Sequence, residues 1–286
     1  MTDTQRNSDD ARDDGRGHGD GNGDGRRAGG GAADGHPPLP PRLSRLTFHG
    51  PLSEARAGGM VARLARTAPA TVLDIGCGWG ELLLRVLAAV PDARGIGLDL
   101  RGEDLARGRR NAAARGLAHR VEFVEESATG TGRGPADLVL CLGAGQALST
   151  AEPPGHTAES LRELRRLVAD DGRVLLGEGF WERPPTSAEL SGMWPDASAD
   201  DHHSLGRLLD LAVAAGFRPE WTEVANTDEW DAFESAYQAD AEVWLAGHPG
   251  HPLAAGTRDR LDRHRAQWMN YRGILGIAYL TLVPAR

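Results

Sequence analysis

Two hydrophobic patterns alternate along the chain from about residue 52 onward. Short, almost wholly apolar runs are typical of strands buried on both faces of a parallel sheet, whereas apolar residues three and four positions apart predict helices with one buried face. The apolar runs predict strands at residues 70–75, 94–100, 121–124, 136–142 and 173–178. The helices predicted before and between these strands span residues 52–67, 79–90, 103–115 and 158–169. This order predicts an α/β fold, a Rossmann-like doubly wound sheet with helices on both faces.

The pattern loosens after residue 178, and residues 181–200 show no regular period. The remaining chain predicts a helix, a strand, two helical stretches and a last strand, at residues 205–215, 218–224, 228–246, 257–275 and 276–283. The fold prediction therefore includes a helical pair inserted before the last strand. Because such an insertion would lie over the carboxyl ends of the strands, we expect residues 228–275 to form a helical substrate cap.

The first 41 residues have a different composition. They contain no Val, Ile, Phe, Tyr or Trp, and consist mostly of Gly, Asp, Arg, Asn and Pro. Such a segment cannot bury enough apolar surface to offset the entropy lost on ordering. We therefore expect a disordered tail at residues 1–41 and one folded domain at residues 42–286, large enough for a sheet with two helical layers.

Charge and composition exclude several function classes. The chain has a formal net charge of −9, and the domain lacks the basic face that a phosphate backbone requires, so we expect no nucleic-acid substrate. No stretch reaches the roughly 20 apolar residues of a membrane span, so no membrane partner is expected. The two cysteines, Cys77 and Cys141, are too few for a disulfide framework and fit a reducing cytoplasm. The oligomeric state stays open.

The most informative segment is the glycine loop at residues 72–81, with the sequence VLDIGCGWGE. Gly76, Gly78 and Gly80 follow a predicted strand and lead into a helix, so a ligand can lie against the backbone. The spacing is GxGxG, whereas dinucleotide-binding loops have GxGxxG, which argues against a nicotinamide-dependent oxidoreductase. Asp74 would repel a pyrophosphate and would attract a cationic amino group.

A second acidic residue follows at the end of the next predicted strand. Asp99 ends the run GLDL, and a carboxylate at this position can accept hydrogen bonds from both hydroxyls of a ribose. Each such charge-assisted bond contributes roughly 1.5–3 kcal/mol. The loop and Asp99 together favour a cationic, ribose-bearing ligand.

Five segments in this order resemble the class I S-adenosylmethionine-dependent methyltransferases: VLDIGCGWG, GLDL, VEFVEESA, ADLVLCLGA and GRVLLGE. The resemblance covers about residues 52–225. It implies a seven-stranded sheet whose last strand is antiparallel, and S-adenosylmethionine as the methyl donor. The residues that it implies for cofactor binding are Asp74, Gly76, Cys77, Gly78, Asp99, Leu100, Ser127, Ala128 and Leu142.

The chain departs from the family pattern at two places. Family members often have Asp at the position of Ser127, where it bonds the adenine amino group; Ser127 would bond less strongly, and Glu126 could substitute. The fourth predicted strand is followed by Gly143-Ala144-Gly145 and not by Asn-Pro-Pro-Tyr, which argues against methylation of adenine or glutamine amino groups.

No residue pattern in the sequence identifies a catalytic base. Methyl transfer requires mainly alignment and a dry site, and only an oxygen or carbon nucleophile strongly requires a base. His49, just before the first helix, and Glu178, at the end of the fifth strand, are the candidates; a capping role for His49 and a salt bridge for Glu178 are the alternatives. His156 and His202 lie in polar surroundings, and no metal site is expected.

The inserted helices carry aromatic stripes. Trp230, Phe233, Tyr237 and Trp244 recur on one face of the first predicted helix, which indicates either core packing or a wall for an apolar acceptor. We expect the methyl acceptor to be a small molecule; a scaffold of the same fold without transferase activity is the alternative. The residues predicted to contact the acceptor are Trp181, Tyr237, Trp268, Tyr271 and Arg272.

Overall fold

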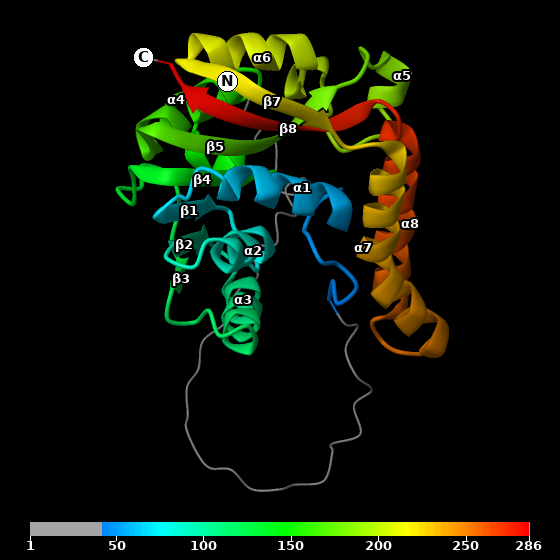
Figure 1. Cartoon of the computed structure of the whole chain (residues 1–286). Coiled ribbons are helices and arrows are strands. Elements are labelled where there is room, and N and C mark those ends of the chain that lie inside the picture. Colours follow the sequence, from blue (N-terminus) through cyan, green and yellow to red (C-terminus); the bar gives the residue numbers. More distant parts are fainter. Residues whose placement is uncertain (1–41, 286) are drawn as a thin grey trace, which may run out of the picture.

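The structure is a computed structural model in which residues 42–285 are described (Figure 1). The predicted disordered tail at residues 1–41 lies outside the described residues. A mixed sheet crosses the described part, with helices on both of its faces and a helical pair standing at one side (Figure 1). None of the described helices is long and apolar enough to cross a membrane.

The strands follow the order β3-β2-β1-β4-β5-β8-β7, and the short β6 pairs with β5. β8 runs antiparallel to both of its neighbours, and the other pairings are parallel. The predicted Rossmann-like sheet with an antiparallel last strand is therefore confirmed, with β6 as an extra strand of two residues. The strands are β1 (Thr71–Ile75), β2 (Arg94–Asp99), β3 (Val121–Glu125), β4 (Ala136–Leu142), β5 (Val168–Trp181), β6 (His203–Ser204), β7 (Phe217–Val224) and β8 (Leu275–Pro284).

Helices cover both faces because side chains of each strand alternate between two apolar layers. One layer packs the sheet against α1, α2 and α3, and the other packs it against α4 and α6. The helices are α1 (Glu54–Ala65), α2 (Glu81–Ala89), α3 (Gly102–Ala114), α4 (His156–Leu167), α5 (Ser187–Leu190), α6 (Leu205–Ala214), α7 (Thr227–Gly247) and α8 (Ala254–Tyr271).

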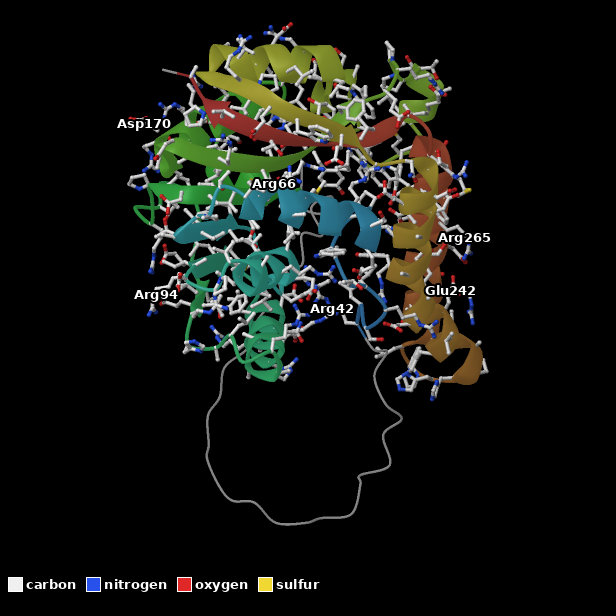
Figure 2. The ribbon with its side chains drawn as sticks, in the orientation of Figure 1. Arg42, Arg66, Arg94, Asp170, Glu242 and Arg265 are labelled. Carbon is white, nitrogen blue, oxygen red and sulfur yellow. The ribbon has the colours of Figure 1, made fainter. Side chains whose placement is uncertain are left out.

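The inserted pair, α7 and α8, lies side by side between β7 and β8, as predicted (Figure 1). A buried carboxylate, Glu234 of α7, holds the pair together. It accepts a hydrogen bond of 2.6 Å from the Tyr271 hydroxyl and lies 2.7 Å from Nε2 of His264, both on α8. Glu242 of α7 and Arg265 of α8 form a further ion pair on the outer side (Figure 2).

The structure departs from the predicted elements at several boundaries, and two of them have a clear physical cause. The helix predicted to residue 169 ends at Leu167, because the buried Val168 already pairs with Ala136 as the first residue of β5. The helix predicted to residue 275 ends at Tyr271, because Gly273 turns the chain with a φ of 74°. Sheet pairing ends the first helix and a glycine turn ends the second, although the apolar residues continue with helical spacing in both.

Candidate functional site

Three glycines turn the chain from β1 into α2. Gly76, Gly78 and Gly80 have positive φ angles of 61°, 54° and 63°, a region that residues with a Cβ rarely adopt. A Cβ at Gly76 would also overlap the side chain of Ala144, and one at Gly80 would overlap the Phe123 ring. Glycine is therefore required here, and the turn leaves its backbone open to a ligand at the carboxyl end of β1.

Asp74 lies near the end of β1, with only 5% of its surface exposed. Burial, and to a smaller extent the charge of Asp99, raise the pKa of the Asp74 carboxyl well above its ordinary value. Within residues 42–285, no group donates a hydrogen bond to this carboxyl or forms an ion pair with it. A buried carboxylate in this state attracts a cation, because a counter-charge would offset its desolvation.

Asp99 ends β2 beside the glycine loop. Its Oδ2 accepts a hydrogen bond of 2.7 Å from the backbone N–H of Gly78, and its Oδ1 accepts one of 2.9 Å from the N–H of Arg101. These bonds fix the carboxylate relative to the loop. Each carboxylate oxygen has a further lone pair, so Asp99 can also accept hydrogen bonds from a ligand.

A cavity of about 250 Å³ opens beside Asp74. Of the residues predicted from the sequence, it brings together His49, Asp74, Gly76, Cys77 and Leu142. Its walls come from the N-terminal segment (residues 42–52), the glycine loop with the start of α2, the end of β4, the first turns of α7, and β8. The lining residues are Phe48, His49, Gly50, Pro51, Leu52, Asp74, Gly76, Cys77, Glu81, Leu82, Leu142, Gly143, Trp230, Phe233, Ile277 and Tyr279.

Four of the residues predicted for cofactor binding lie at the ends of β2 and β3 and do not line this cavity. They are Asp99, Leu100, Ser127 and Ala128, and Asp99 is adjacent to β3 because it pairs with Glu125. The Leu100 residue is 69% exposed, Ser127 is exposed and Ala128 is buried. Glu126, the alternative to Ser127, instead forms an ion pair of 2.7 Å with Arg133.

Hydrogen bonds hold the N-terminal segment against the loop and α3. The guanidinium of Arg107 donates to the carbonyl oxygens of Leu43 and Leu46, at 2.9 and 2.7 Å. The indole N–H of Trp79 donates to the carbonyl oxygen of Thr47 at 2.8 Å. Trp79 is almost fully buried and belongs to the glycine loop, so this residue ties the loop to the segment that covers it.

Ion pairs tie the same segment to α3 and α7. Arg42 forms an ion pair of 2.8 Å with Asp104 of α3 (Figure 2). Asp240 of α7 accepts hydrogen bonds from the Ser44 backbone N–H at 2.6 Å and from Nε of Arg45 at 3.1 Å. The segment therefore bridges α3 and α7 and forms one wall of the cavity.

His49 lies in this wall. Its imidazole stacks on the Trp79 indole, with the ring centroids 5.3 Å apart and an angle of 14° between the planes. His49 is exposed by its accessible surface, but the atoms packed around its imidazole desolvate it and lower its pKa, which favours the neutral ring. A neutral imidazole on a cavity wall can accept a proton.

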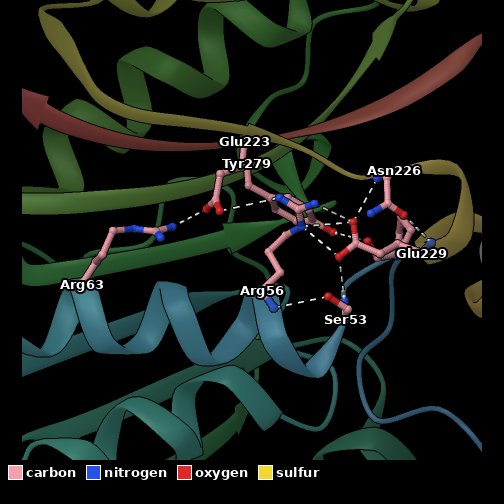
Figure 3. Close-up of polar contacts among 8 residues, drawn as sticks. Ser53, Arg56, Arg63, Glu223, Asn226, Glu229 and Tyr279 are labelled. Atoms are coloured by element: carbon pink, nitrogen blue, oxygen red, sulfur yellow. Dashed lines mark hydrogen bonds and ion pairs between the residues drawn. The ribbon is translucent and has the colours of Figure 1, made fainter.

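A polar network anchors the start of α7 to α1 (Figure 3). Glu229 accepts hydrogen bonds from the Arg56 guanidinium, at 2.8 Å, and from the Ser53 backbone N–H, at 3.1 Å. Arg63 pairs with Glu223 of β7 beside it. Burial alone would raise the pKa of Glu229, but the hydrogen bonds from Arg56 and Ser53 outweigh it and lower this pKa to about 2.

The network positions two aromatic residues that are not among those predicted to contact the acceptor. Trp230 and Phe233 follow Glu229 in the first turns of α7, and both line the cavity. They belong to the aromatic stripe predicted from the sequence. Their position at the start of the helix could have identified them as cavity residues, because the chain enters α7 directly from the strand ends.

Glu178 lies on the other face of β5. Its neighbours in β5, Gly177 and Gly179, pair with Tyr279 and Ile277 of β8, and both of these β8 residues line the cavity. Because successive side chains of a strand point to opposite faces, the Glu178 side chain points away from the cavity. The Glu178 carboxyl instead lies against Gly145 in the turn after β4. Burial raises its pKa to about 7, and it forms no ion pair with another described residue. The catalytic role of Glu178 therefore stays a prediction, away from the cavity.

The five residues predicted to contact the acceptor do not line the cavity. Trp181, Trp268 and Tyr271 pack in an apolar cluster with Met193 and Ile274. Arg272 forms an ion pair of 2.7 Å with Asp231 of α7. Tyr237, the fifth, is partly exposed and stacks on His264. Tyr237, Tyr271 and Arg272 help to hold the helical pair together, and the contact of all five residues with an acceptor stays a prediction.

The histidines beyond β5 also occupy structural positions. His202 lies over Gly179 and contacts the rings of Trp181 and Trp194 edge-on. Burial lowers its pKa to about 4. Among residues 42–285, no group of three or more His, Cys, Asp or Glu side chains is arranged to hold a metal ion.

Comparisons with known proteins decide the family. Residues 72–172 match the family model described as a methyltransferase domain. The solved structure of an S-adenosylmethionine-dependent methyltransferase from Geobacter sulfurreducens, in complex with S-adenosyl-L-homocysteine, is similar with a TM-score of 0.72 and 26% identity, over 85% of this chain and 98% of that one. The family model and the structural likeness support a class I S-adenosylmethionine-dependent methyltransferase. The predicted family and transferase activity are thereby confirmed.

Two relatives show how far the likeness extends. This methyltransferase is 26% identical to the uncharacterized protein YjhP of Escherichia coli K12, over 78% of this chain and 88% of that protein. It is 29% identical to trans-aconitate 2-methyltransferase of Methylobacterium nodulans, over 68% and 69% of the two chains. The likeness extends well beyond the glycine loop and includes most of the methyltransferase's described residues.

Proposed function

We propose that this methyltransferase binds S-adenosylmethionine across the glycine loop and transfers its methyl group to a small-molecule acceptor in the cavity beside Asp74. The observation that carries the proposal is the buried Asp74 carboxyl, which faces the cavity and has no partner among the described residues. The amino group of S-adenosylmethionine would supply the missing counter-charge. When bound, this cofactor supplies a methyl group on a sulfonium, which is already a good leaving group.

The residues around the loop fit the other parts of the cofactor. Asp99 is fixed by Gly78 and retains lone pairs for the two ribose hydroxyls. Leu100, Ser127 and Ala128 lie at the neighbouring strand ends, where the family resemblance implies the adenine site. Gly78 leaves room for the ligand, since a Cβ at this position would meet no atom within 4 Å.

The cavity favours a small acceptor over a macromolecule. Its walls include the N-terminal segment and α7, which cover the strand ends, and a cavity of about 250 Å³ holds a compact molecule. The formal net charge of −9 also disfavours a nucleic-acid acceptor. The chain's own residues would align the acceptor and exclude water, and His49 would accept a proton where the nucleophile needs one.

A transfer assay tests the proposed function. The full chain is incubated with methyl-labelled S-adenosylmethionine and a metabolite extract, and the products are separated by size. We expect label in the small-molecule fraction, and loss of that label with the variant Asp74→Asn. Label that appears only in protein or nucleic acid would contradict the small-molecule acceptor.

A further inference from the structure

Four aromatic residues form much of the cavity wall. Phe48 comes from the N-terminal segment, Trp230 and Phe233 from α7, and Tyr279 from β8. The Tyr279 hydroxyl donates a hydrogen bond of 3.0 Å to the carbonyl oxygen of Pro51, so this polar group is already satisfied. Aromatic rings gathered around one space attract cations through their electron-rich faces.

The charges around the cavity also favour a cation over an anion. Of the described residues that line it, none is an Arg. Two are acidic: Glu81 is neutralised by ion pairs of 2.8 Å with Arg85 and 2.7 Å with Arg115, whereas Asp74 is unpaired. With the proposed cofactor bound, its amino group pairs with Asp74, and the lining offers no Arg as a counter-charge for the carboxylate of an acidic acceptor.

We propose that the acceptor is an amine with an apolar body, methylated at nitrogen. The inference rests on the proposed function and deepens it. The lone pair of an uncharged amine forms the new N–C bond, while the C–S bond breaks and its electron pair stays on sulfur. The positive charge passes from the sulfonium to the methylated nitrogen, so no new charge is created among the four rings. No base is needed for bond formation, and the product ammonium passes its proton to water after release.

Three small probes of similar size test this proposal: tetramethylammonium, tert-butanol and pivalate. Each is titrated into the full chain, with and without bound S-adenosyl-L-homocysteine, and binding is followed by the NMR signals of the tryptophan indoles. We expect tetramethylammonium, which resembles a methylated product, to bind at least about tenfold more tightly than the other two. Pivalate binding as tight as that of tetramethylammonium would overturn the proposal, as would equal binding of tert-butanol or no binding of tetramethylammonium.

Two variants locate the probe. We expect Phe233→Leu to weaken tetramethylammonium binding about fivefold and to leave tert-butanol binding unchanged, because the loss concerns the ring and not the volume. The control is Trp221→Leu, which removes an exposed ring on β7 outside the cavity. Unchanged tetramethylammonium binding in Phe233→Leu would overturn the assignment to the cavity. If S-adenosyl-L-homocysteine fails to bind, the proposed function fails; if it binds and tetramethylammonium does not, only the amine proposal fails.

Discussion

At the scale of single residues, Asp74 combines a structural cost with a proposed binding role. Its pKa is raised by burial and by the charge of Asp99, so the folded protein holds the Asp74 proton more tightly than the unfolded chain does. Asp74 therefore lowers the free energy of unfolding at pH values above its ordinary pKa of 3.8, and this penalty shrinks as the pH falls from the raised pKa to 3.8, below which it is absent. A bound cation would remove the same penalty at neutral pH.

The variant Asp74→Asn separates the two effects. Because the buried charge is removed, we expect the unliganded protein to be more stable at pH 7, by about 1–3 kcal/mol. We expect affinity for S-adenosyl-L-homocysteine to fall at least about tenfold. Thermal unfolding with and without S-adenosyl-L-homocysteine measures both, and the exposed Asp92→Asn is the matched control. A variant that is less stable and still binds normally would contradict this account of Asp74.

Gly76 offers a second prediction at this scale. The variant Gly76→Ala places a Cβ at a φ of 61° and against Ala144, and we expect it to destabilise the fold by about 2–3 kcal/mol. Gly116→Ala has a similar φ of 69° but meets no atom within 4 Å, so it reports the backbone effect alone, about 1 kcal/mol. Denaturant unfolding of the two variants gives the difference, and equal losses would show that the Ala144 contact has no effect.

The sequence predicted the loop residues because their roles depend on local geometry. The positive φ at Gly76 and Gly78 and the nearness of Asp74 to the turn follow from a few adjacent residues. Trp230 and Phe233 were seen only as part of a stripe, because the direction in which a helix face points depends on distant contacts. The direction of Tyr271 was equally hidden in the sequence: its side chain was expected near an acceptor, but its hydroxyl donates a hydrogen bond to Glu234.

At the scale of elements, the start of α7 determines the shape of the cavity. Glu229 binds Arg56 and Ser53 of the α1 region, which holds the first turn of α7 over the strand ends (Figure 3). Because the pKa of Glu229 is lowered to about 2, its stabilising effect is complete above its ordinary pKa of 4.5 and is lost as the pH falls toward 2.

The variant Glu229→Gln tests this anchor. We expect a loss of about 2–3 kcal/mol in stability at pH 7 and a smaller loss at acidic pH, together with a raised KM for the acceptor. Affinity for S-adenosyl-L-homocysteine should change little, since Glu229 lies away from the glycine loop. The control is Glu242→Gln on the outer ion pair of α7 with Arg265, which should cost less than about 1 kcal/mol (Figure 2). Equal effects of the two substitutions on stability and on KM would contradict the anchoring role.

At the scale of the whole molecule, alternating strands and helices were enough to predict the layers, and the family resemblance supplied the antiparallel last strand. The two-residue β6 and the one-turn α5 were not predicted, because such short elements depend on pairing with β5 and packing on α8 rather than on a period. The covering role of the N-terminal segment also depends on distant partners, chiefly Asp104, Arg107 and Asp240.

Two truncations test the proposed division at residue 42. A chain that starts at residue 42 keeps Arg42 and every described contact of the N-terminal segment, so we expect unchanged stability and S-adenosyl-L-homocysteine affinity. A chain that starts at residue 53 loses five lining residues and uncovers Trp79, and we expect weaker binding by at least about tenfold. Calorimetry and thermal unfolding compare the two truncated chains with the full chain. Weaker binding by the chain that starts at residue 42 would show that residues 1–41 contribute to binding.

Calorimetric titration of the full chain with S-adenosyl-L-homocysteine tests the central claim most directly. We expect one site with a dissociation constant in the micromolar range, about −8 kcal/mol in binding free energy. We also expect at least about tenfold weaker binding for Asp99→Ala, in a variant whose thermal unfolding shows that it is folded. No measurable binding, or equal binding by folded Asp99→Ala, would contradict the assignment of the glycine loop and Asp99 as the cofactor site.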